Sequence, residues 1–302
     1  MPSQITDVPF GLRAADIVKH VINIDSRFRD PDPSSTASDF QFRLLTPVRN
    51  VLRIRITSIE FPNNYHMFSE ARRNTVIKIR FVDTDAKAKT LTVRVPDGNY
   101  LLDDMRLMLL SYISPHLAGF DIVFSNITGE FTFSWTKPFT LDTVCSDEDT
   151  YDRPFDYGLG YNLGFSRGVF HSVGPDTAGN YNVVSDLKAY FAGDSYVFLK
   201  INNFDCVRQT VNGNDFTAMA KIVITSPKDY VNFDDYGGDH AKEVTFPNPY
   251  DLKRFRIRVL DAYGEIIDMD SSNFSFSLEV LEVKNLNLYN TIRDAFADGW
   301  RV

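Results

Sequence analysis

The sequence predicts a mainly β protein: one antiparallel sandwich of eight strands with an inserted α+β subdomain. Of 302 residues, 25 are Phe and 14 are Tyr, and flat, bulky side chains favour the half-buried surface of a strand. Apolar and polar residues alternate along short segments near both ends of the chain. One long segment, residues 100–113, instead has helical spacing. The hydrophobic share of 43% is enough to bury a substantial core.

The strands of the sandwich are predicted on either side of residues 75–180. The clearest alternation occurs in 40–44 and 52–61, where polar residues and arginines separate large apolar ones. Residues 30–38 and 46–50 are rich in breakers and turn the chain around these strands. Eight segments are predicted as strands: 21–24, 40–44, 52–61, 196–201, 218–225, 243–246, 255–260 and 274–283. Eight antiparallel strands in one sandwich match a jelly roll.

The inserted segment has a different pattern of predicted elements, with a helix between pairs of strands. A strand pair, a helix, a second strand pair and one further short strand are predicted at 76–82, 91–95, 100–113, 120–124, 131–135 and 139–141. Asp97 or Asn99 can cap the start of the helix. This ββαββ unit can close a small core of its own. Residues 142–180 are the least regular part of the chain and begin with an acidic stretch.

These patterns divide the chain into an N-terminal arm (1–20), a discontinuous jelly-roll domain (21–74 and 181–284), an inserted subdomain (75–180) with an irregular loop (142–180), and a C-terminal tail (285–302). The tail is predicted either as a short helix around 289–297 that docks on a neighbour or as a frayed end. The N-terminus lacks the apolar stretch of a secretory signal. No segment approaches the roughly 18 apolar residues that span a membrane.

Charge is unevenly distributed along the chain. The net charge is −8. Residues 1–80 carry 12 Lys and Arg against 8 Asp and Glu, whereas the remainder carries 20 against 32. This asymmetry indicates two faces with different partners, unless the two segments interleave in space and their charges cancel. Direct nucleic-acid binding is not predicted, because it normally needs a concentrated basic patch.

No catalytic residues, cofactor or metal ligands are predicted, and the chain is not expected to be an enzyme. Cys145 and Cys206 form neither a disulfide framework nor the four-ligand spacing of structural zinc, and a reducing compartment fits them best. The five histidines have neither HxH nor HExxH spacing and are expected to be structural: His20, His66, His116, His171 and His240.

Two loop motifs are given structural interpretations. The glycines of GLGYNLG (158–164) have a spacing one residue longer than a dinucleotide loop, and the acidic stretch before them would repel a pyrophosphate. A flexible glycine-rich loop anchored by Leu163 and Phe165 is expected instead. The acidic runs at 147–149 and 234–239 contain ligand types that calcium prefers but lack its regular spacing, so solvated loops are predicted.

The remaining candidate site is a contact between subunits. Arg43, Arg53 and Arg55 alternate with apolar residues and are predicted to lie together on the outer face of the first sheet. One interpretation is a solvated face. The other is a salt-bridge surface that meets the acidic residues Asp147, Glu148 and Asp149 of a neighbouring subunit, since arginine binds carboxylates bidentately.

Several of these segments resemble virion proteins of nucleocytoplasmic large DNA viruses, the giant viruses. The resemblance is carried by VINIDSRFR (21–29), a Pro/Ser loop, SDFQF (38–42) and VLRIRITSIEFPN (51–63). Weaker matches follow in DGNY (97–100), LGF (163–165) and FSFSLE (274–279). The match therefore touches most of the chain at intervals, while residues 142–180 match no motif of the family.

The resemblance implies a jelly-roll capsid protein of the minor capsid or penton type, located in the virion and assembled in the host cytoplasm. A double jelly-roll major capsid protein would need a second set of strands. Expected partners are the major capsid protein and other capsid subunits, with a homopentamer if the chain is a penton. The resemblance implies no cofactor; a place near an internal membrane is compatible with it.

An alternative from a different class is a binding module. In this interpretation the insertion at 75–180 is a glycan- or receptor-binding head on the virion surface. Exposed aromatic residues beside carboxylates favour such a site, and Trp135 and Tyr161 are the candidates. An enzyme of unknown chemistry is a third alternative and requires a pocket with convergent polar groups.

Overall fold

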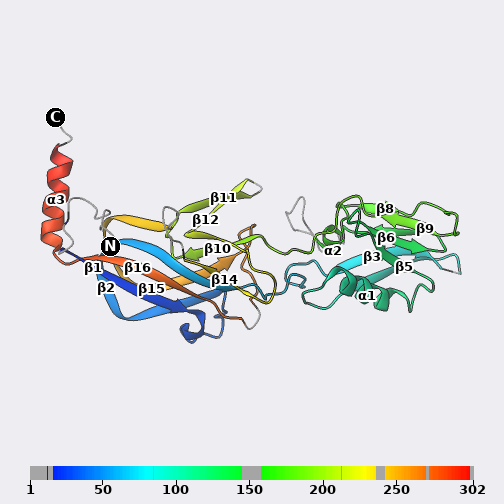
Figure 1. The fold of residues 1–302 in the computed structure, drawn as a ribbon, viewed down its shortest axis with the longest axis horizontal. Helices are drawn as coiled ribbons and strands as arrows, with labels where there is room; N and C mark the ends of the chain where they lie inside the picture. Colours follow the sequence, from blue (N-terminus) through cyan, green and yellow to red (C-terminus); the bar gives the residue numbers. More distant parts are fainter. Residues whose placement is uncertain are drawn as a thin grey trace. The chain divides into compact units, whose positions relative to one another are not determined.

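The computed structural model describes residues 12, 16–83, 85–144, 158–211, 213–235, 242–269 and 272–299. The chain consists of two compact units (Figure 1). Unit 1 contains Met1–Tyr65 and Asp194–Val302, and unit 2 is the continuous segment His66–Gly193. The chain therefore leaves unit 1 once, builds unit 2, and returns to complete unit 1.

Unit 1 is built around one antiparallel sheet of seven strands. The strand order is β1-β16-β2-β15-β10-β13, and β14 also pairs with β2. Its strands are β1 (Ile17–Asp25), β2 (Asp39–Pro62), β10 (Tyr196–Ile201), β13 (Ala220–Val223), β14 (Val231–Asp234), β15 (Glu243–Leu260) and β16 (Ser275–Val283). A short helix, η3 (Ser26–Phe28), follows β1, and a separate hairpin joins β11 (Val207–Val211) to β12 (Asn214–Ala218).

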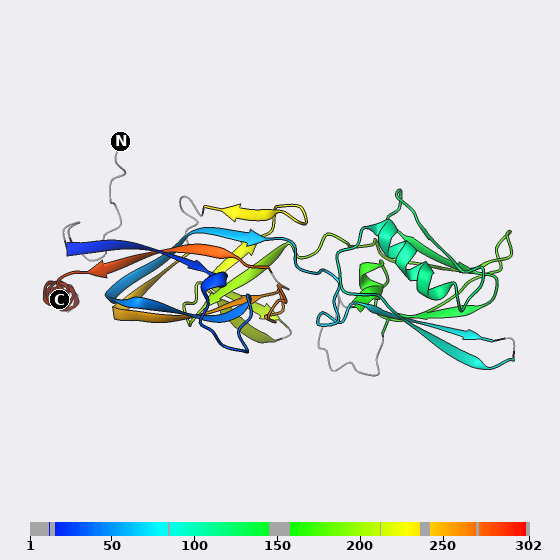
Figure 2. The same ribbon diagram turned by 90° about the horizontal axis from the view of Figure 1, so that it is seen from below.

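Two very long strands make this sheet curl around its own core (Figure 2). β2 has 24 residues and β15 has 18, and their pairing contains three register shifts. Such bulges bend a strand and increase its twist. As a result Phe40 and Ile59, near opposite ends of β2, belong to the same buried cluster, which also contains Phe255, Phe276 and Leu199.

The long strands also explain where the predicted strand count fails. The predicted pairs 40–44 with 52–61, and 243–246 with 255–260, are each one continuous strand. Pro247 and Pro249 lie inside a register shift of β15, where a missing amide donor is tolerated. The breakers therefore bend these strands without ending them. A mainly antiparallel β fold is confirmed, whereas the eight-stranded sandwich is not.

The C-terminal segment forms α3 (Leu286–Gly299), which packs on unit 1 of the same chain. Tyr289 is fully buried in a small cluster with Leu12, Leu52, Leu281 and other apolar residues of β1 and β16. The predicted helix in the tail is thus present, and at Tyr289 it covers its own sheet.

Unit 2 contains two small antiparallel sheets and a helix. The first sheet has the order β4-β3-β7-β8 and the second β5-β6-β9. Its elements are β3 (Val76–Val82), β4 (Ala88–Arg94), α1 (Leu102–Ile113), β5 (Asp121–Phe124), β6 (Phe131–Trp135), β7 (Phe139–Asp142), α2 (Gly158–Asn162), β8 (Val169–His171) and β9 (Tyr181–Val184). Both sheets and α1 share one buried aromatic-rich cluster. The predicted strand pairs and helix of this segment are confirmed.

The predicted cap of the helix α1 is wrong. Asp97 and Asn99 do not cap α1, because their carboxylate and amide oxygens accept the backbone N–H groups of Glu70 and Met67. The carboxylate of Asp104 accepts the N–H of Leu101 instead.

The glycine-rich segment is also not a flexible loop. It begins with the helix α2, and a Cβ added at Gly160 would lie 2.5 Å from Cβ of Thr143, so a larger residue does not fit there. Gly164 has a φ of +85°, a conformation that glycine adopts without strain. Leu163 and Phe165 are fully buried, as the predicted apolar anchor requires.

Candidate functional site

The three arginines predicted to share a face lie in two separate clusters along β2. Arg53 and Arg55 belong to one cluster, whereas Arg43 precedes Arg53 by ten positions on the same strand. At about 3.3 Å per residue, that separation is about 30 Å along the strand. The register shifts between these positions also change which residues share a face. Arg43 and the Arg53–Arg55 pair therefore belong to two separate sites.

The first cluster is centred on Glu279 of β16. Its carboxylate lies 3.4 Å from guanidinium nitrogens of both Arg53 and Arg55, and 3.3 Å from Nζ of Lys19. Glu243 approaches Arg53 at 3.8 Å. The side chain of Arg53 is 8% exposed and that of Glu279 is 11% exposed. We name this group the Glu279 cluster; it joins β1, β2, β15 and β16 within one chain.

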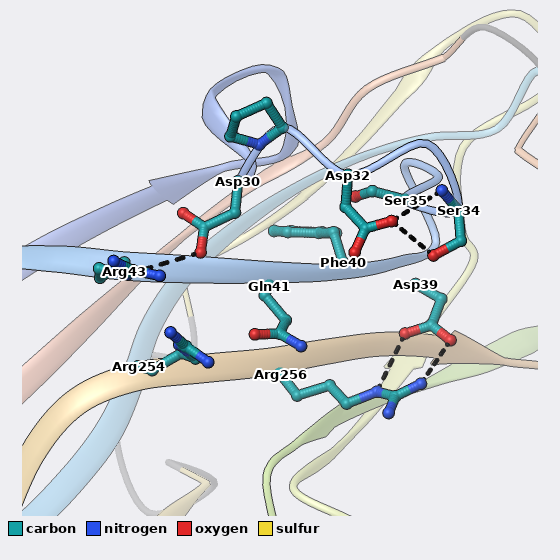
Figure 3. A pocket seen from close by; sticks show the side chains of 11 residues that line it. Asp30, Asp32, Ser34, Ser35, Asp39, Phe40, Gln41, Arg43, Arg254 and Arg256 are labelled. Carbon is teal, nitrogen blue, oxygen red and sulfur yellow. Dashed lines mark hydrogen bonds and ion pairs between the residues drawn. The ribbon is translucent and has the colours of Figure 1, made fainter.

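The second cluster lines an open polar cleft of about 580 Å³ at the N-terminal end of β2 (Figure 3). One wall is the loop that precedes β2, and the floor is formed by β2 and β15. The lining residues are Asp30, Pro31, Asp32, Ser34, Ser35, Asp39, Phe40, Gln41, Arg43, Arg254 and Arg256. We name this site the arginine cleft.

Two arginines of the cleft stand directly opposite each other. Arg43 of β2 and Arg254 of β15 are cross-strand partners in the antiparallel register. Both are exposed. Arg43 has only a loose ion pair, 3.8 Å from Asp30, and within the described residues the Arg254 guanidinium makes no ion pair or hydrogen bond. Like charges directly opposite each other are unfavourable in a sheet.

The third arginine is held in place. Nε and Nη2 of Arg256 donate to the two carboxylate oxygens of Asp39 at 3.2 and 3.0 Å. These hydrogen bonds raise the pKa of Arg256 above its ordinary value. The pair is bidentate, which fixes the plane of the guanidinium. Arg256 and Asp39 thus form a neutral, ordered end of the arginine cleft.

The loop wall is tied down by hydrogen bonds. The amide of Asp30 donates to the carbonyl of Gln41 at 2.8 Å. The Asp32 carboxylate accepts the hydroxyl and amide of Ser34 at 2.7 and 2.8 Å, and these bonds lower the pKa of Asp32. The hydroxyl of Ser35 is buried and has no hydrogen-bond partner in the described part of the chain. A buried polar atom of this kind normally has a partner.

Basic residues continue across the sheet beyond the cleft. Arg258 pairs in register with Asp39 on one side and with Lys200 of β10 on the other. Nζ of Lys200 donates to the hydroxyl of Thr217 at 3.4 Å. Together with Arg43, Arg254 and Arg256, these two residues give five cations on three adjacent strands.

The structure therefore brings Arg53 and Arg55 together and separates them from Arg43. The predicted acidic partners Asp147, Glu148 and Asp149 lie outside the described residues, as does Cys145. The sequence reasoning missed Arg254 and Arg256. Their signal was present: in residues 254–259 arginines alternate with Phe, Ile and Val in the same way as around Arg43.

Other candidate residues have structural surroundings. Trp135 is buried in unit 2, where its Nε1 donates to the carbonyl of Ala118, and Tyr161 is half-buried beside Tyr190. Nε2 of His20 lies 2.6 Å from the carboxylate of Glu282. Across the described ranges, no group of three or more His, Cys, Asp or Glu is arranged to hold a metal ion. In those same ranges, no helix has both the length and the apolar content of a membrane span.

No protein-family model and no curated protein matches this chain. Among solved structures, it is similar to the mavirus penton protein at 9% identity and a TM-score of 0.37, over 88% of this chain and 98% of that one. It is also similar to VP17, a capsid protein of bacteriophage P23-77, at 9% identity and a TM-score of 0.17, over 89% and 98% of the two chains.

Proposed function

We propose that this chain is a structural subunit of an icosahedral virion, a penton or minor capsid protein that acts through protein–protein contacts and catalyses no reaction. The observation that carries the proposal is the arginine cleft. Arg43 and Arg254 stand opposite each other in an open site, Asp30 pairs only loosely with Arg43, and a further anionic group against the two arginines would relieve their repulsion. A subunit that presents such a site is suited to assembly.

The architecture of unit 1 supports this role. The segments that carry the resemblance to giant-virus virion proteins, 21–29 and 51–63, form most of β1, all of η3 and the second half of β2. Those elements are the frame of a curled antiparallel sheet that encloses its own core. We propose that this sheet is a variant of the jelly roll, with unit 2 as the inserted domain.

We propose a contact between subunits that uses Arg43 of the three predicted arginines. Of the predicted set, Arg43 is the exposed residue, and its one ion pair, with Asp30, is loose. Arg53 and Arg55 contribute mainly by holding Glu279 of their own chain. The partner residues are Asp147, Glu148 and Asp149 of the next copy. In a penton, this contact joins two different surfaces and closes a ring.

The alternative is a glycan-binding head on unit 2 with Trp135 and Tyr161 as its exposed aromatic residues. Trp135 does not meet that requirement. Trp135 is 5% exposed and its indole N–H is already bonded inside unit 2. Stacking on a sugar requires an exposed aromatic face.

Sedimentation equilibrium of the full chain tests the proposed function. A penton forms a discrete pentamer as its concentration rises. A minor capsid protein stays monomeric alone and co-sediments with other capsid subunits of the same virion. A chain that remains monomeric at every concentration and also fails to co-sediment with those subunits would overturn the proposal.

A further inference from the structure

We propose that the arginine cleft is a binding site for an acidic protein segment, with Arg43 and Arg254 as the carboxylate-binding residues. This inference rests on the proposed assembly role and names the partner chemistry of that site. The occupant to which we commit is the segment 146–157 of a second copy, SDEDTYDRPFDY, which carries five carboxylates and one arginine.

The first support is the unpaired guanidinium of Arg254, with the loosely paired Arg43 opposite it. The Arg254 guanidinium makes no ion pair or hydrogen bond among the described residues, and the Arg43 guanidinium is 3.8 Å from Asp30, beyond hydrogen-bond distance. A carboxylate placed between the two guanidinium groups would relieve their repulsion and accept hydrogen bonds from both. Charge-assisted bonds of this kind are among the strongest that side chains make.

The second support is that the site is organised before binding. Arg256 is fixed by its bidentate pair with Asp39, and the Asp30–Asp32 wall is held by bonds to Gln41 and Ser34. A partner that binds here does not have to order these groups itself, which lowers the entropic cost of association.

The third support distinguishes a protein segment from a nucleic acid. The cleft carries carboxylates as well as guanidinium groups: Asp30, Asp32 and Asp39 line the same walls. A polyphosphate backbone would be repelled by these carboxylates, because its charge is uniformly negative. A peptide with several acids and one base can place opposite charges on both kinds of group. The Arg153 of segment 146–157 supplies that base.

The test is fluorescence polarisation of a labelled peptide, SDEDTYDRPFDY, titrated with the full chain. We expect saturable binding that weakens as salt is raised, since exposed charges are screened. Arg254→Glu and Arg43→Glu should each weaken binding by at least about tenfold, as expected for losing a charge-assisted contact. Far-UV circular dichroism confirms that each variant is folded.

Two controls are matched to these variants. Arg208→Glu changes an exposed arginine on the separate hairpin, where it lies 3.8 Å from Asp215, and should leave binding unchanged. A peptide with Asn and Gln in place of the acids should not bind. A single-stranded oligonucleotide of equal charge is the competing ligand.

Each outcome decides between the two proposals. If Arg208→Glu weakens peptide binding as much as Arg254→Glu does, the attraction is nonspecific. The cleft is then not the binding site. The proposal also fails if the oligonucleotide binds more tightly than the peptide and Arg254→Glu abolishes that binding, because the cleft would then bind nucleic acid. If the chain assembles but does not bind the peptide, and Arg254→Glu leaves assembly unchanged, the assembly role stands. The cleft as the binding site, and with it the contact of Arg43 with the acidic segment, is then wrong. A chain that binds the peptide but never assembles retains the cleft and loses the function.

Discussion

The Glu279 cluster and the arginine cleft contain the same residue type on the same strand, yet they differ in what faces them. In the Glu279 cluster, register places a nearly buried carboxylate against two guanidinium groups and a lysine. In the cleft, register places Arg254 against Arg43. In the first arrangement the cations are paired with a carboxylate of the same chain. In the second, two cations face each other and can be paired with a carboxylate of another molecule. Cross-strand partners, more than residue type, therefore decide which arginines are available for binding.

The largest expected difference is in stability. Glu279→Gln removes the charge that neutralises the nearly buried Arg53 and should lower the free energy of unfolding by about 3 kcal/mol. Equilibrium unfolding in urea measures it. The control is Asp103→Asn, at an exposed i,i+3 pair with Arg106, which should change stability by less than about 0.5 kcal/mol. Equal midpoints for the two variants would contradict the role of Glu279.

A pair of double-mutant cycles sharpens the comparison. The coupling between Arg53→Gln and Glu279→Gln should exceed about 1 kcal/mol, because the two groups are in contact and shielded from water. The coupling between Arg43→Gln and Asp30→Asn should stay below about 0.5 kcal/mol, since that pair is exposed and 3.8 Å apart. Equal coupling energies in the two cycles would remove the distinction between the clusters.

Charge reversal in the cleft should affect stability less than either change in the Glu279 cluster. Arg254→Glu replaces a like-charged cross-strand pair by an opposite-charged one, so the free energy of unfolding should rise by a few tenths of a kcal/mol. Thermal unfolding of this variant beside the unmodified chain provides the measurement. A loss of more than about 1 kcal/mol would mean that Arg254 supports the fold itself.

The smallest expected effect is a pH dependence at the end of β1. Hydrogen bonding to the Arg27 guanidinium holds the pKa of Asp25 below its ordinary value of 3.8. A lowered pKa gives stability that is present above pH 4 and is lost as the pH falls further. Asp25→Asn keeps an oxygen that can accept the backbone N–H of Arg27 at the start of η3. It should therefore be less stable than the unmodified chain near neutral pH, and the difference should shrink in acid. A constant difference across urea titrations at several pH values would argue against this ion pair.

Local patterns predicted more of unit 2 than of unit 1. The strands at 76–82 and 131–135 and the helix ending at Ile113 were predictable because alternation and helical spacing depend only on neighbouring residues. The length of β2 and β15 was not, since Pro47 and Pro247 are ordinary breakers in a sequence. Only the pairing of the two strands, which lie far apart in the chain, lets them bend without ending.

The candidate site shows the same division. Alternation placed apolar residues inward and arginines outward, and it identified Arg43 as exposed. It did not reveal that Glu279, more than 200 residues away in sequence, lies against Arg53 and Arg55. Nor did it reveal that Arg254 lies opposite Arg43. Both facts are set by register between distant strands, which a single sequence does not contain.

The central claim is that the cleft of one copy receives the acidic segment of the next, and a full charge swap tests it most directly. We predict that Arg43→Glu with Arg254→Glu abolishes assembly in sedimentation equilibrium, and that Asp147→Lys, Glu148→Lys and Asp149→Lys together do the same. One chain carrying all five changes should assemble again, because its two surfaces are complementary with their signs exchanged. A half-swapped chain that assembles normally, or a fully swapped folded chain that stays dissociated, would contradict the account.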